Sequence, residues 1–394
     1  MSEWKNVLLT DVSVKIGDGL HGTPTYDESG DYHFINGNNL LNGKIFIKPD
    51  TKKINKTEFD KIKKDLKSST ILLSINGTIG NVSKYTYEKC ALGKSVCYIN
   101  LDENIILRDY FYYECLSYNF QSYLDNIATG TTIPNVPLKG LRSYEFRIPP
   151  LTEQEAIASV LCSLDDKVDL LHRQNKTLQS MSETLFRQWF IEEAQDDWVE
   201  GTLGSIASNV RENITNKNIS SEAMYVGLEH IDRRNIALLK NGNGCDVDSN
   251  KSKFLTGDIL FGKLRPYFHK VCTAPFDGIC STDILVIRPK KHNLQCFSLF
   301  AFFQNEVIEF ANIASGGTRM PRIDWASLAN YPISLPPDDK LNDFEKIVSS
   351  QVRKINFNIN KIKILEKLRD TLLPKLMSGE VQVQYAEEAI ASVA

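Results

Sequence analysis

The sequence contains one long internal repeat, and this repeat limits the possible folds more than any other feature. The segment IATGTTIPNV from Ile127 recurs as IASGGTRMPRI from Ile313, and each is followed by a Pro-Pro pair and a long helical pattern. Pro134 and Pro321 lie 187 positions apart. Solenoid repeats have periods of roughly 20–50 residues, so this period indicates a duplicated globular domain with a helix attached. We therefore expect two similar domains in one chain.

The composition is that of an ordinary globular protein. The 394 residues predict two or three domains, and 42% hydrophobic and 24% charged residues are typical of soluble chains. No apolar run approaches the roughly 18–20 residues that span a bilayer, and the N-terminus lacks a signal-peptide pattern, so we expect a cytoplasmic protein without membrane contact. A net charge of −3 means that DNA binding would need local basic clefts or a partner's positive charge.

The sequence lacks the motifs of a catalytic or metal centre. The eight cysteines form no C-x-x-C pair and no histidine stands at ligand spacing, so no metal site is predicted. There is no Gly-rich phosphate loop, and the Pro-Pro pairs are not the Asn/Asp-Pro-Pro-aromatic motif of a DNA adenine methyltransferase. Pro337-Asp338 with Lys340 faintly resembles a nuclease motif, but capping of a helix explains it better. We expect no catalytic residue and no bound cofactor.

Each copy combines strand-like and helical segments in the same order. TILLSINGTIGNV from Thr70 matches DILFGKLRPYFHKV from Asp258, and an aromatic-rich helical segment follows in both copies. The predicted fold class is α+β, with two mixed α/β domains and an internal pseudo-two-fold repeat.

Two long helices follow the two domains. The first begins at Thr152 and runs to about Glu193, and the second begins near Asp338. Pro374 is expected to kink the second helix or end it early, and Gly379 to stop it. Heptad spacing predicts the buried seams, which are Ile157, Leu161, Leu164, Val168, Leu171, Leu178, Leu185 and Trp189, then Phe344, Val348, Ile355, Ile362, Leu365, Leu372 and Leu376. Asn175 and Ser182 occupy the missing seam positions of the first helix.

Charge predicts how these helices pair. The first half of helix one is acidic and the second half of helix two is basic, as at Asp165 and Arg369. Only an antiparallel coiled coil brings these halves together. The alternative is two unrelated, solvated helices.

Short motifs precede the helices in matching order. The first copy has Ala128-Thr129-Gly130-Thr131-Thr132, Pro134-Asn135, Leu138, Leu141 and Ile148-Pro149-Pro150-Leu151-Thr152-Glu153-Gln154. The second copy has Ala314-Ser315-Gly316-Gly317-Thr318, Pro321, Leu328 and Ile333-Ser334-Leu335-Pro336-Pro337. This duplicated order resembles the specificity (S) subunits of type I restriction–modification enzymes. The second copy departs from the pattern at Pro337-Asp338-Asp339-Lys340, where Leu-x-Glu-Gln is usual.

The resemblance implies a function and partners. Each domain would be a target recognition domain for one half of a split double-stranded DNA sequence, and the helices would set the spacing and dock two methyltransferase (modification) subunits. Restriction (nuclease–translocase) subunits can join such a complex. S-adenosylmethionine, ATP and Mg would belong to those partner subunits. The alternative function is a non-catalytic coiled-coil interaction scaffold without DNA specificity.

The implied division of the chain has five segments. These are 1–151 (target recognition domain 1), 152–195 (spacer helix 1), 196–337 (target recognition domain 2), 338–380 (spacer helix 2) and 381–394 (C-terminal tail).

Candidate DNA-binding residues lie mainly in the loops that precede the proline of each copy. Arg and Lys contact phosphates, whereas Arg, Asn, Gln, Ser and Thr recognise base edges, and glycine permits close approach. The candidates are Asn38, Thr129, Gly130, Thr131, Thr132 and Asn135 in the first copy, and Lys263, Arg265, Ser315, Gly316, Gly317, Thr318, Arg319 and Arg322 in the second. The alternative is that the Gly-Thr loops and the Asn-rich segment are plain turns.

Overall fold

The computed structural model describes residues 4–130, 132–317 and 319–391, and the chain forms two compact units. Unit 1 comprises Met1–Lys167 and Ile364–Ala394, and unit 2 comprises Val168–Lys363. Each long helix therefore contributes one part to each unit. The five predicted segments are a different kind of division and stay a prediction.

Unit 1 is built around a four-stranded antiparallel sheet in the order β2-β10-β7-β8. Beside it lie the pair β1-β11, the sheet β6-β3-β9 with β3 parallel to β9, and the pair β4-β5. The strands are β1 Lys5–Leu8, β2 Ser13–Asp18, β3 Tyr32–Ile35, β4 Leu40–Leu41, β5 Lys44–Ile45, β6 Lys53–Ile54, β7 Thr70–Ser74, β8 Val82–Lys84, β9 Cys90–Leu92, β10 Val96–Leu101 and β11 Glu145–Ile148. The helices are α1 Lys56–Ile62, α2 Arg108–Leu116, α3 Tyr118–Ile127 and α4 Leu138–Arg142.

Unit 2 repeats this topology. Its central sheet has the order β13-β21-β18-β19, and β15 and β20 form the parallel pair. Here β17 and β14 extend the second sheet to five strands, an addition that the sequence did not indicate. The strands are β12 Val199–Thr202, β13 Ala207–Val210, β14 Asn213–Ile214, β15 Met224–Val226, β16 Gly242–Asn243, β17 Lys251–Phe254, β18 Ile259–Gly262, β19 Val271–Thr273, β20 Gly278–Cys280, β21 Ile284–Pro289 and β22 Pro332–Leu335. The helices are α6 Leu203–Ile206, α7 Gln295–Phe302, α8 Asn305–Ile313 and α9 Trp325–Ala329.

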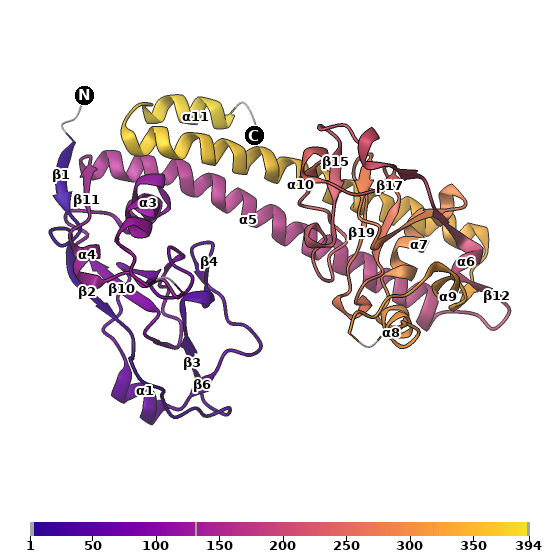
Figure 1. Ribbon diagram of the computed structural model, residues 1–394, viewed down its shortest axis with the longest axis horizontal. Helices are drawn as coiled ribbons and strands as arrows, with labels where there is room; N and C mark the ends of the chain where they lie inside the picture. Colours follow the sequence, from indigo (N-terminus) through magenta and orange to yellow (C-terminus); the bar gives the residue numbers. More distant parts are fainter. Residues whose placement is uncertain (1–3, 131, 318, 392–394) are drawn as a thin grey trace. The chain divides into compact units, whose positions relative to one another are not determined.

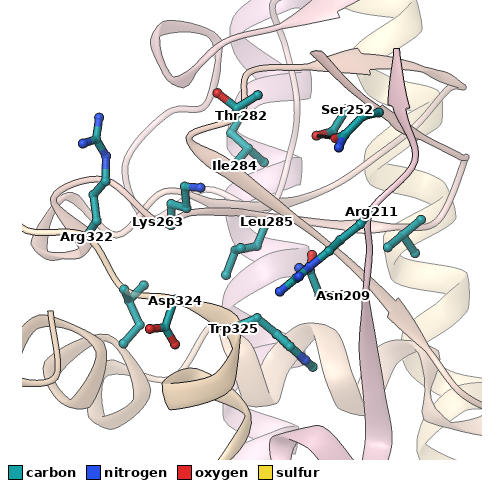
Figure 2. A pocket seen from close by; sticks show the side chains of 13 residues that line it. Asn209, Arg211, Ser252, Lys263, Thr282, Ile284, Leu285, Arg322, Asp324 and Trp325 are labelled. Carbon is teal, nitrogen blue, oxygen red and sulfur yellow. Dashed lines mark hydrogen bonds between the residues drawn. The ribbon is translucent and has the colours of Figure 1, made fainter. Parts of the chain in front are cut away.

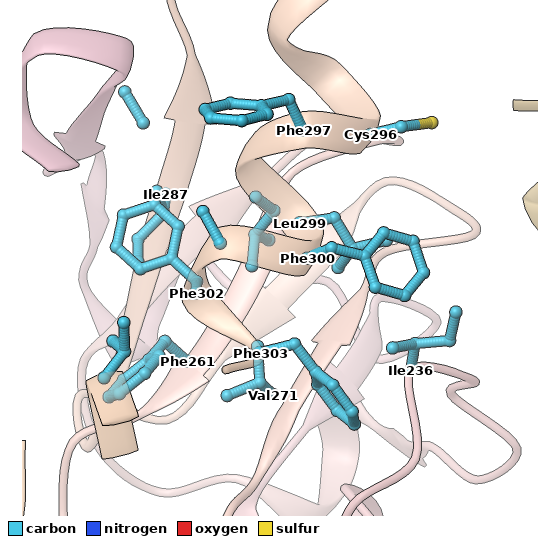
Figure 3. Close-up of a cluster of buried hydrophobic side chains, with 14 of the residues drawn as sticks. Ile236, Phe261, Val271, Ile287, Cys296, Phe297, Leu299, Phe300, Phe302 and Phe303 are labelled. Carbon is cyan, nitrogen blue, oxygen red and sulfur yellow. The ribbon is translucent and has the colours of Figure 1, made fainter. Parts of the chain in front are cut away.

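The core of unit 2 forms where the aromatic helix α7 covers the central sheet. Phe297, Phe300 and Phe302 of α7 are buried together with Phe261 and Ile287 of the sheet (Figure 3). Aromatic side chains bury large apolar areas, so this cluster is a major source of stability. Phe186 and Phe344 of the long helices belong to the same cluster, which fixes their unit 2 portions to the sheet domain.

The long helices confirm the heptad prediction. Helix α5 spans Leu151–Arg187 and continues into a π turn at Gln188–Glu192, and α10 spans Asp338–Ser378. The predicted seam residues are buried, apart from Leu178, Leu185 and Trp189, which are partly buried. Asn175 and Ser182 are buried at the polar seam positions.

Of the two outcomes expected at Pro374, the early end of α10 is wrong, and the kink stays a prediction. Proline removes one helical hydrogen bond, but Leu372 and Leu376 on either side are buried, and this burial keeps the last turns helical. The helix stops before Gly379, which adopts the left-handed conformation (φ +75°) expected of a terminating glycine. The chain then turns back into α11, Val383–Ala391 (Figure 1).

The two helices pair in the predicted antiparallel sense within each unit. In unit 1, Asp165 of α5 forms an ion pair with Arg369 of α10 at 2.8 Å. Trp4 contacts the start of α5 and the residue that follows α10. Its Nε1 donates to Glu153 (3.4 Å), and its ring lies beside Gly379. In unit 2, Asn175 is hydrogen-bonded to Asn358, and Ser182, seven residues later in α5, is hydrogen-bonded to Gln351, seven residues earlier in α10. The two helices therefore run in opposite directions. None of the helices in the described ranges combines the length with the apolar character of a membrane-spanning segment.

Candidate nucleic-acid interface

The Gly-Thr segment of each unit forms the same small hairpin. In unit 1, the backbones of Thr129 and Asn135 exchange two hydrogen bonds of 2.8 Å. In unit 2, Gly316 and Arg322 do the same at 3.1 and 3.0 Å. Gly130 and Gly317 both have φ +93°, a left-handed conformation that glycine adopts without steric cost. Among the described residues, the duplicated motif therefore gives the same backbone pairing and the same glycine conformation in both units.

Each hairpin is attached to the end of a central strand by equivalent bonds. Past β7, the Ile75 carbonyl accepts from Val136 (2.8 Å) and Gly77 donates to the Pro134 carbonyl (3.0 Å). Past β18, the Lys263 carbonyl accepts from Ile323 (3.1 Å) and Arg265 donates to the Pro321 carbonyl (2.8 Å). The structure thus brings the predicted residues Lys263 and Arg265 to the hairpin that carries Arg319 and Arg322.

The predicted residues differ in what their side chains do. The hydroxyl of Thr129 donates to the Asn135 carbonyl (3.2 Å) and that of Ser315 donates to Ala311 (2.6 Å), so both hold the local backbone. The amide oxygen of Asn135 accepts from Asn76 (3.1 Å). Exposed residues suited to contact are Gly130, Thr132, Gly316, Gly317, Arg319 and Arg322. Thr131 and Thr318 lie outside the described residues.

Asn38 lies at the same edge of unit 1 as the hairpin. It is the exposed residue of a short 3-10 turn, Gly37–Asn39, whose Gly37 carbonyl accepts from Asn81 (3.5 Å) in the loop after β7. Its neighbour Asn39 is buried and bonds the backbone of Asn36 and Phe46 at 2.9 Å each. Asn38 is therefore available for contact, whereas Asn39 shapes the turn.

Unit 2 has a cleft of about 400 Å³ beside its hairpin (Figure 2). Three cationic residues line it, and Arg322 is oriented by an ion pair with Asp283 (Nε to Oδ1, 3.1 Å). The principal polar and aromatic lining residues are Asn209, Arg211, Lys263, Arg322, Asp324 and Trp325. The sequence predicted Lys263 and Arg322 but missed Asn209 and Arg211. Asn209 lies in β13 and Arg211 directly follows that strand, more than 50 positions before Lys263, so only the pairing of β13 with β21 brings them to the cleft.

Asp324 is the one carboxylate among these principal lining residues. It accepts from the backbone of Ser327 (2.7 Å) at the start of α9, and hydrogen bonds from Ser327 lower its pKa. The cleft therefore combines cationic donors with an ionised acceptor. Oδ1 of Asp324 is the atom that accepts the hydrogen bond from the Ser327 backbone, and the residue as a whole is exposed.

The segment after β18 is held in an unusual backbone conformation. Arg265 (φ +52°) and His269 (φ +50°) are left-handed on both sides of a 3-10 turn, Pro266–Phe268. Non-glycine residues pay roughly 1–2 kcal/mol for this conformation, and such strain tends to occur at functional sites. Burial lowers the pKa of His269 to about 4, so its ring is neutral at physiological pH. In unit 1, Gly77 occupies the place of Arg265.

A second surface runs along the unit 2 portion of α5. Two shallow cavities of about 520 and 470 Å³ adjoin there and share Thr177. Met181 and Leu170 are exposed apolar residues in their walls, and Arg173, Lys176 and Lys354 line them as cations. Phe357 of α10, which is 187 positions after Leu170, is also exposed.

The described part of the chain holds no cluster of three or more His, Cys, Asp or Glu side chains that could bind a metal ion. Its perturbed groups are mostly buried structural residues, such as Cys90, whose pKa burial raises to about 12.

Comparison with known proteins identifies the family. Residues 1–180 and 195–369 each match the type I restriction modification DNA specificity domain. The chain is 24% identical to the type I restriction enzyme MjaIX specificity subunit of Methanocaldococcus jannaschii, over 97% of this chain and 94% of that one. It is 23% identical to the EcoDI specificity subunit of Escherichia coli, over 98% and 90%.

The fold agrees with this result. A crystal structure of a type I restriction–modification S subunit from M. genitalium matches 95% of this chain and 96% of that chain, with a TM-score of 0.62 and 18% sequence identity. Repeated topology, repeated hairpins and two sequence matches lead to one conclusion: the chain belongs to the family of type I restriction–modification specificity subunits.

Proposed function

We propose that this chain recognises a two-part DNA target, one half with each unit, and that the hairpin edge of each unit is the recognition surface. The observation that carries this proposal is the repeated hairpin, attached to the strand end by the same backbone bonds in both units. Two domains that recognise different half-sites can share one backbone structure, provided that the side chains presented to the bases differ. The family is one of DNA specificity domains, so the chain is a recognition subunit rather than the catalytic one.

The partners follow from the helices. We infer that α5 and α10 dock two modification subunits at equivalent places, such as those marked by exposed Leu170 and Phe357. Apolar residues with cationic neighbours suit a partner surface that is apolar with an acidic rim. S-adenosylmethionine, ATP and Mg would be bound by the partner subunits. A scaffold without DNA specificity is not favoured by the family match.

A pair of glycine variants tests the hairpin. Gly317→Ala forces an L-residue into φ +93°, whereas Gly316→Ala adds a methyl group with no heavy atom within 4 Å. With a strain of roughly 1–2 kcal/mol, Gly317→Ala should weaken binding of the assembled methyltransferase complex to its target DNA by about 5- to 30-fold. Gly316→Ala adds no backbone strain, so it should weaken binding less than Gly317→Ala. Equal binding by all three proteins would contradict the role of the hairpin.

The spacer role has a separate test. Removing one heptad from α5 and one from the facing part of α10 keeps the seam in register and shortens both helices by roughly 10 Å. The preferred number of unread base pairs between the two half-sites should then fall. A complex that keeps its original spacing would show that the helices do not set it.

A further inference from the structure

The cleft of unit 2 differs in charge from the equivalent positions of unit 1. In the central sheets, β18 follows β7 by 188 positions and β21 follows β10 by the same number, as their registers show. Lys263 therefore corresponds to Ile75. The hairpin offset of 187 pairs Arg322 with Asn135. Thus a cation in unit 2 replaces an apolar side chain in one case and an amide in the other.

Arg211 shows the largest difference. Val210 pairs with Val286 of β21, and continuing this register by one residue places Arg211 opposite Leu285. In unit 1 the residue opposite Cys97, which corresponds to Leu285, is Asp18. A cation in unit 2 thus replaces an anion in unit 1. Three cationic side chains line one cleft of unit 2, and their counterparts in unit 1 carry no positive charge.

We propose that this cleft recognises G·C base pairs, so that the half-site bound by unit 2 contains guanine at the positions facing Arg211, Lys263 and Arg322. This inference rests on the proposed function. In the major groove guanine presents two adjacent acceptors, O6 and N7, to which Arg donates in a bidentate manner and Lys also donates. The Asp283 carboxylate holds the Arg322 guanidinium at 3.1 Å and so limits its rotamers.

Asp324 favours a base pair over a phosphate as the occupant. An ionised carboxylate in the cleft repels the DNA backbone, but it accepts a hydrogen bond from the N4 amino group of cytosine, the partner of guanine. Cationic donors and one acidic acceptor together match the major-groove edge of a G·C pair. A phosphate-binding site would gain nothing from Asp324.

Unit 1 should recognise a different half-site. Asn135 and Ile75 stand where unit 2 has Arg322 and Lys263, so neither position offers a guanidinium or an ammonium group. Asn side chains pair with adenine, and apolar side chains contact the methyl group of thymine. The complete target is therefore asymmetric, and the guanines that these three cations recognise lie in the half contacted by unit 2.

The test is to sequence the methylated bases in cells that express the modification subunits with the wild-type chain, Arg322→Ala, Arg322→Lys or Arg211→Ala. We expect one half-site to contain G·C pairs. Each alanine variant should lower the preference for guanine at one position of that half-site by about 5- to 150-fold, and leave the other half-site unchanged. Arg322→Lys keeps the charge but loses the bidentate geometry, so it should also relax that position. The unchanged half-site shows that the variants are folded.

Two results would overturn the inference. If both alanine variants weaken methylation uniformly at all sequences while Arg322→Lys methylates like the wild type, the cations bind phosphates. If the guanine preference survives both alanine variants, the cleft does not recognise it. In both cases specific methylation by the wild type leaves the proposed function standing, whereas a wild-type complex that methylates no defined sequence removes the proposed function and this inference together.

Discussion

The buried amide pair in the helix seam yields the sharpest prediction about stability. Asn358 is fully buried and its Nδ2 donates to Oδ1 of Asn175 at 2.8 Å. Within the described residues, Nδ2 of Asn175 and Oδ1 of Asn358 have no hydrogen-bond partner. The pair thus sits among apolar seam residues with only part of its bonding capacity used. Such a polar seam position fixes the register of a coiled coil at a cost in stability.

Single and double substitutions should change the free energy of unfolding in different directions. Asn358→Leu leaves the Asn175 oxygen buried without this donor, which costs roughly 1–3 kcal/mol. Replacing both residues by Leu removes the unpaired polar atoms as well and adds apolar burial. The double variant should therefore be at least as stable as the wild type. For a unit of this size, a loss of roughly 2 kcal/mol lowers Tm by about 4–8 °C.

Scanning calorimetry of the full chain measures this through the transition of unit 2. The variants are Asn175→Leu, Asn358→Leu and the double substitution, with Ile355→Leu as a seam control that should cost less than about 1.5 kcal/mol. Additive losses from the two single substitutions would refute the argument, because they would mean that the two amides stabilise the helices independently rather than as a pair.

Three further predictions concern unit 1 and the hairpin arginine. Burial raises the pKa of Glu114 from 4.5 to about 7, although the hydroxyl of Tyr144 donates to it. The folded state then binds the proton more tightly than the unfolded state, so stability should fall by up to about 3 kcal/mol as pH rises from 4.5 to 7, and Glu114→Gln should flatten that part of the pH–Tm curve. Gln154→Leu removes hydrogen bonds to Leu107, Ile105 and Pro149 and should cost roughly 3 kcal/mol in the calorimetric transition of unit 1, with no change in that of unit 2. Arg319→Ala should weaken target binding in a gel-shift assay by roughly 1–3 kcal/mol, and an unchanged affinity and sequence preference would exclude Arg319 from the interface.

The regular features of the fold could be predicted from the sequence because they depend on local periodicity. The heptad spacing identified the seam, and the charges of Asp165 and Arg369 identified the antiparallel pairing. The early end expected at Pro374 does not occur, and this has a physical cause. Proline costs one hydrogen bond and crowds the preceding turn, and the burial of Leu372 and Leu376 outweighs this cost. The strand extension by β17 and β14 depends on pairing with β20, which short segments of sequence do not encode.

The candidate interface could be predicted only in part. The repeat revealed the hairpins, since two copies of one motif are a stronger signal than one Gly-Thr turn. It also drew attention to Arg322, and the strand-like run before Lys263 drew attention to that residue. The structure places both in one cleft. Arg211 carried no local signal, because its importance arises from the register of β13 against β21. Residues that meet through long-range pairing need the structure to be found.

The duplication also indicates which differences between the copies carry information. At the helix entry, Gln154 accepts from the backbone of Leu107 before α2, whereas the equivalent position in unit 2 is the buried Leu341. There Glu345, one turn further along α10, accepts instead from Cys296 at the start of α7 (2.8 Å). The departure from the family motif at this helix is thus compensated, and the same attachment is kept with different residues. The substitutions that line the cleft have another character. Lys263 keeps the backbone bond that attaches the hairpin and Arg211 keeps its place beside β21, while the charge that faces the cleft changes. A compensated difference preserves a structure, whereas an uncompensated change of charge on a preserved frame alters what that structure can bind.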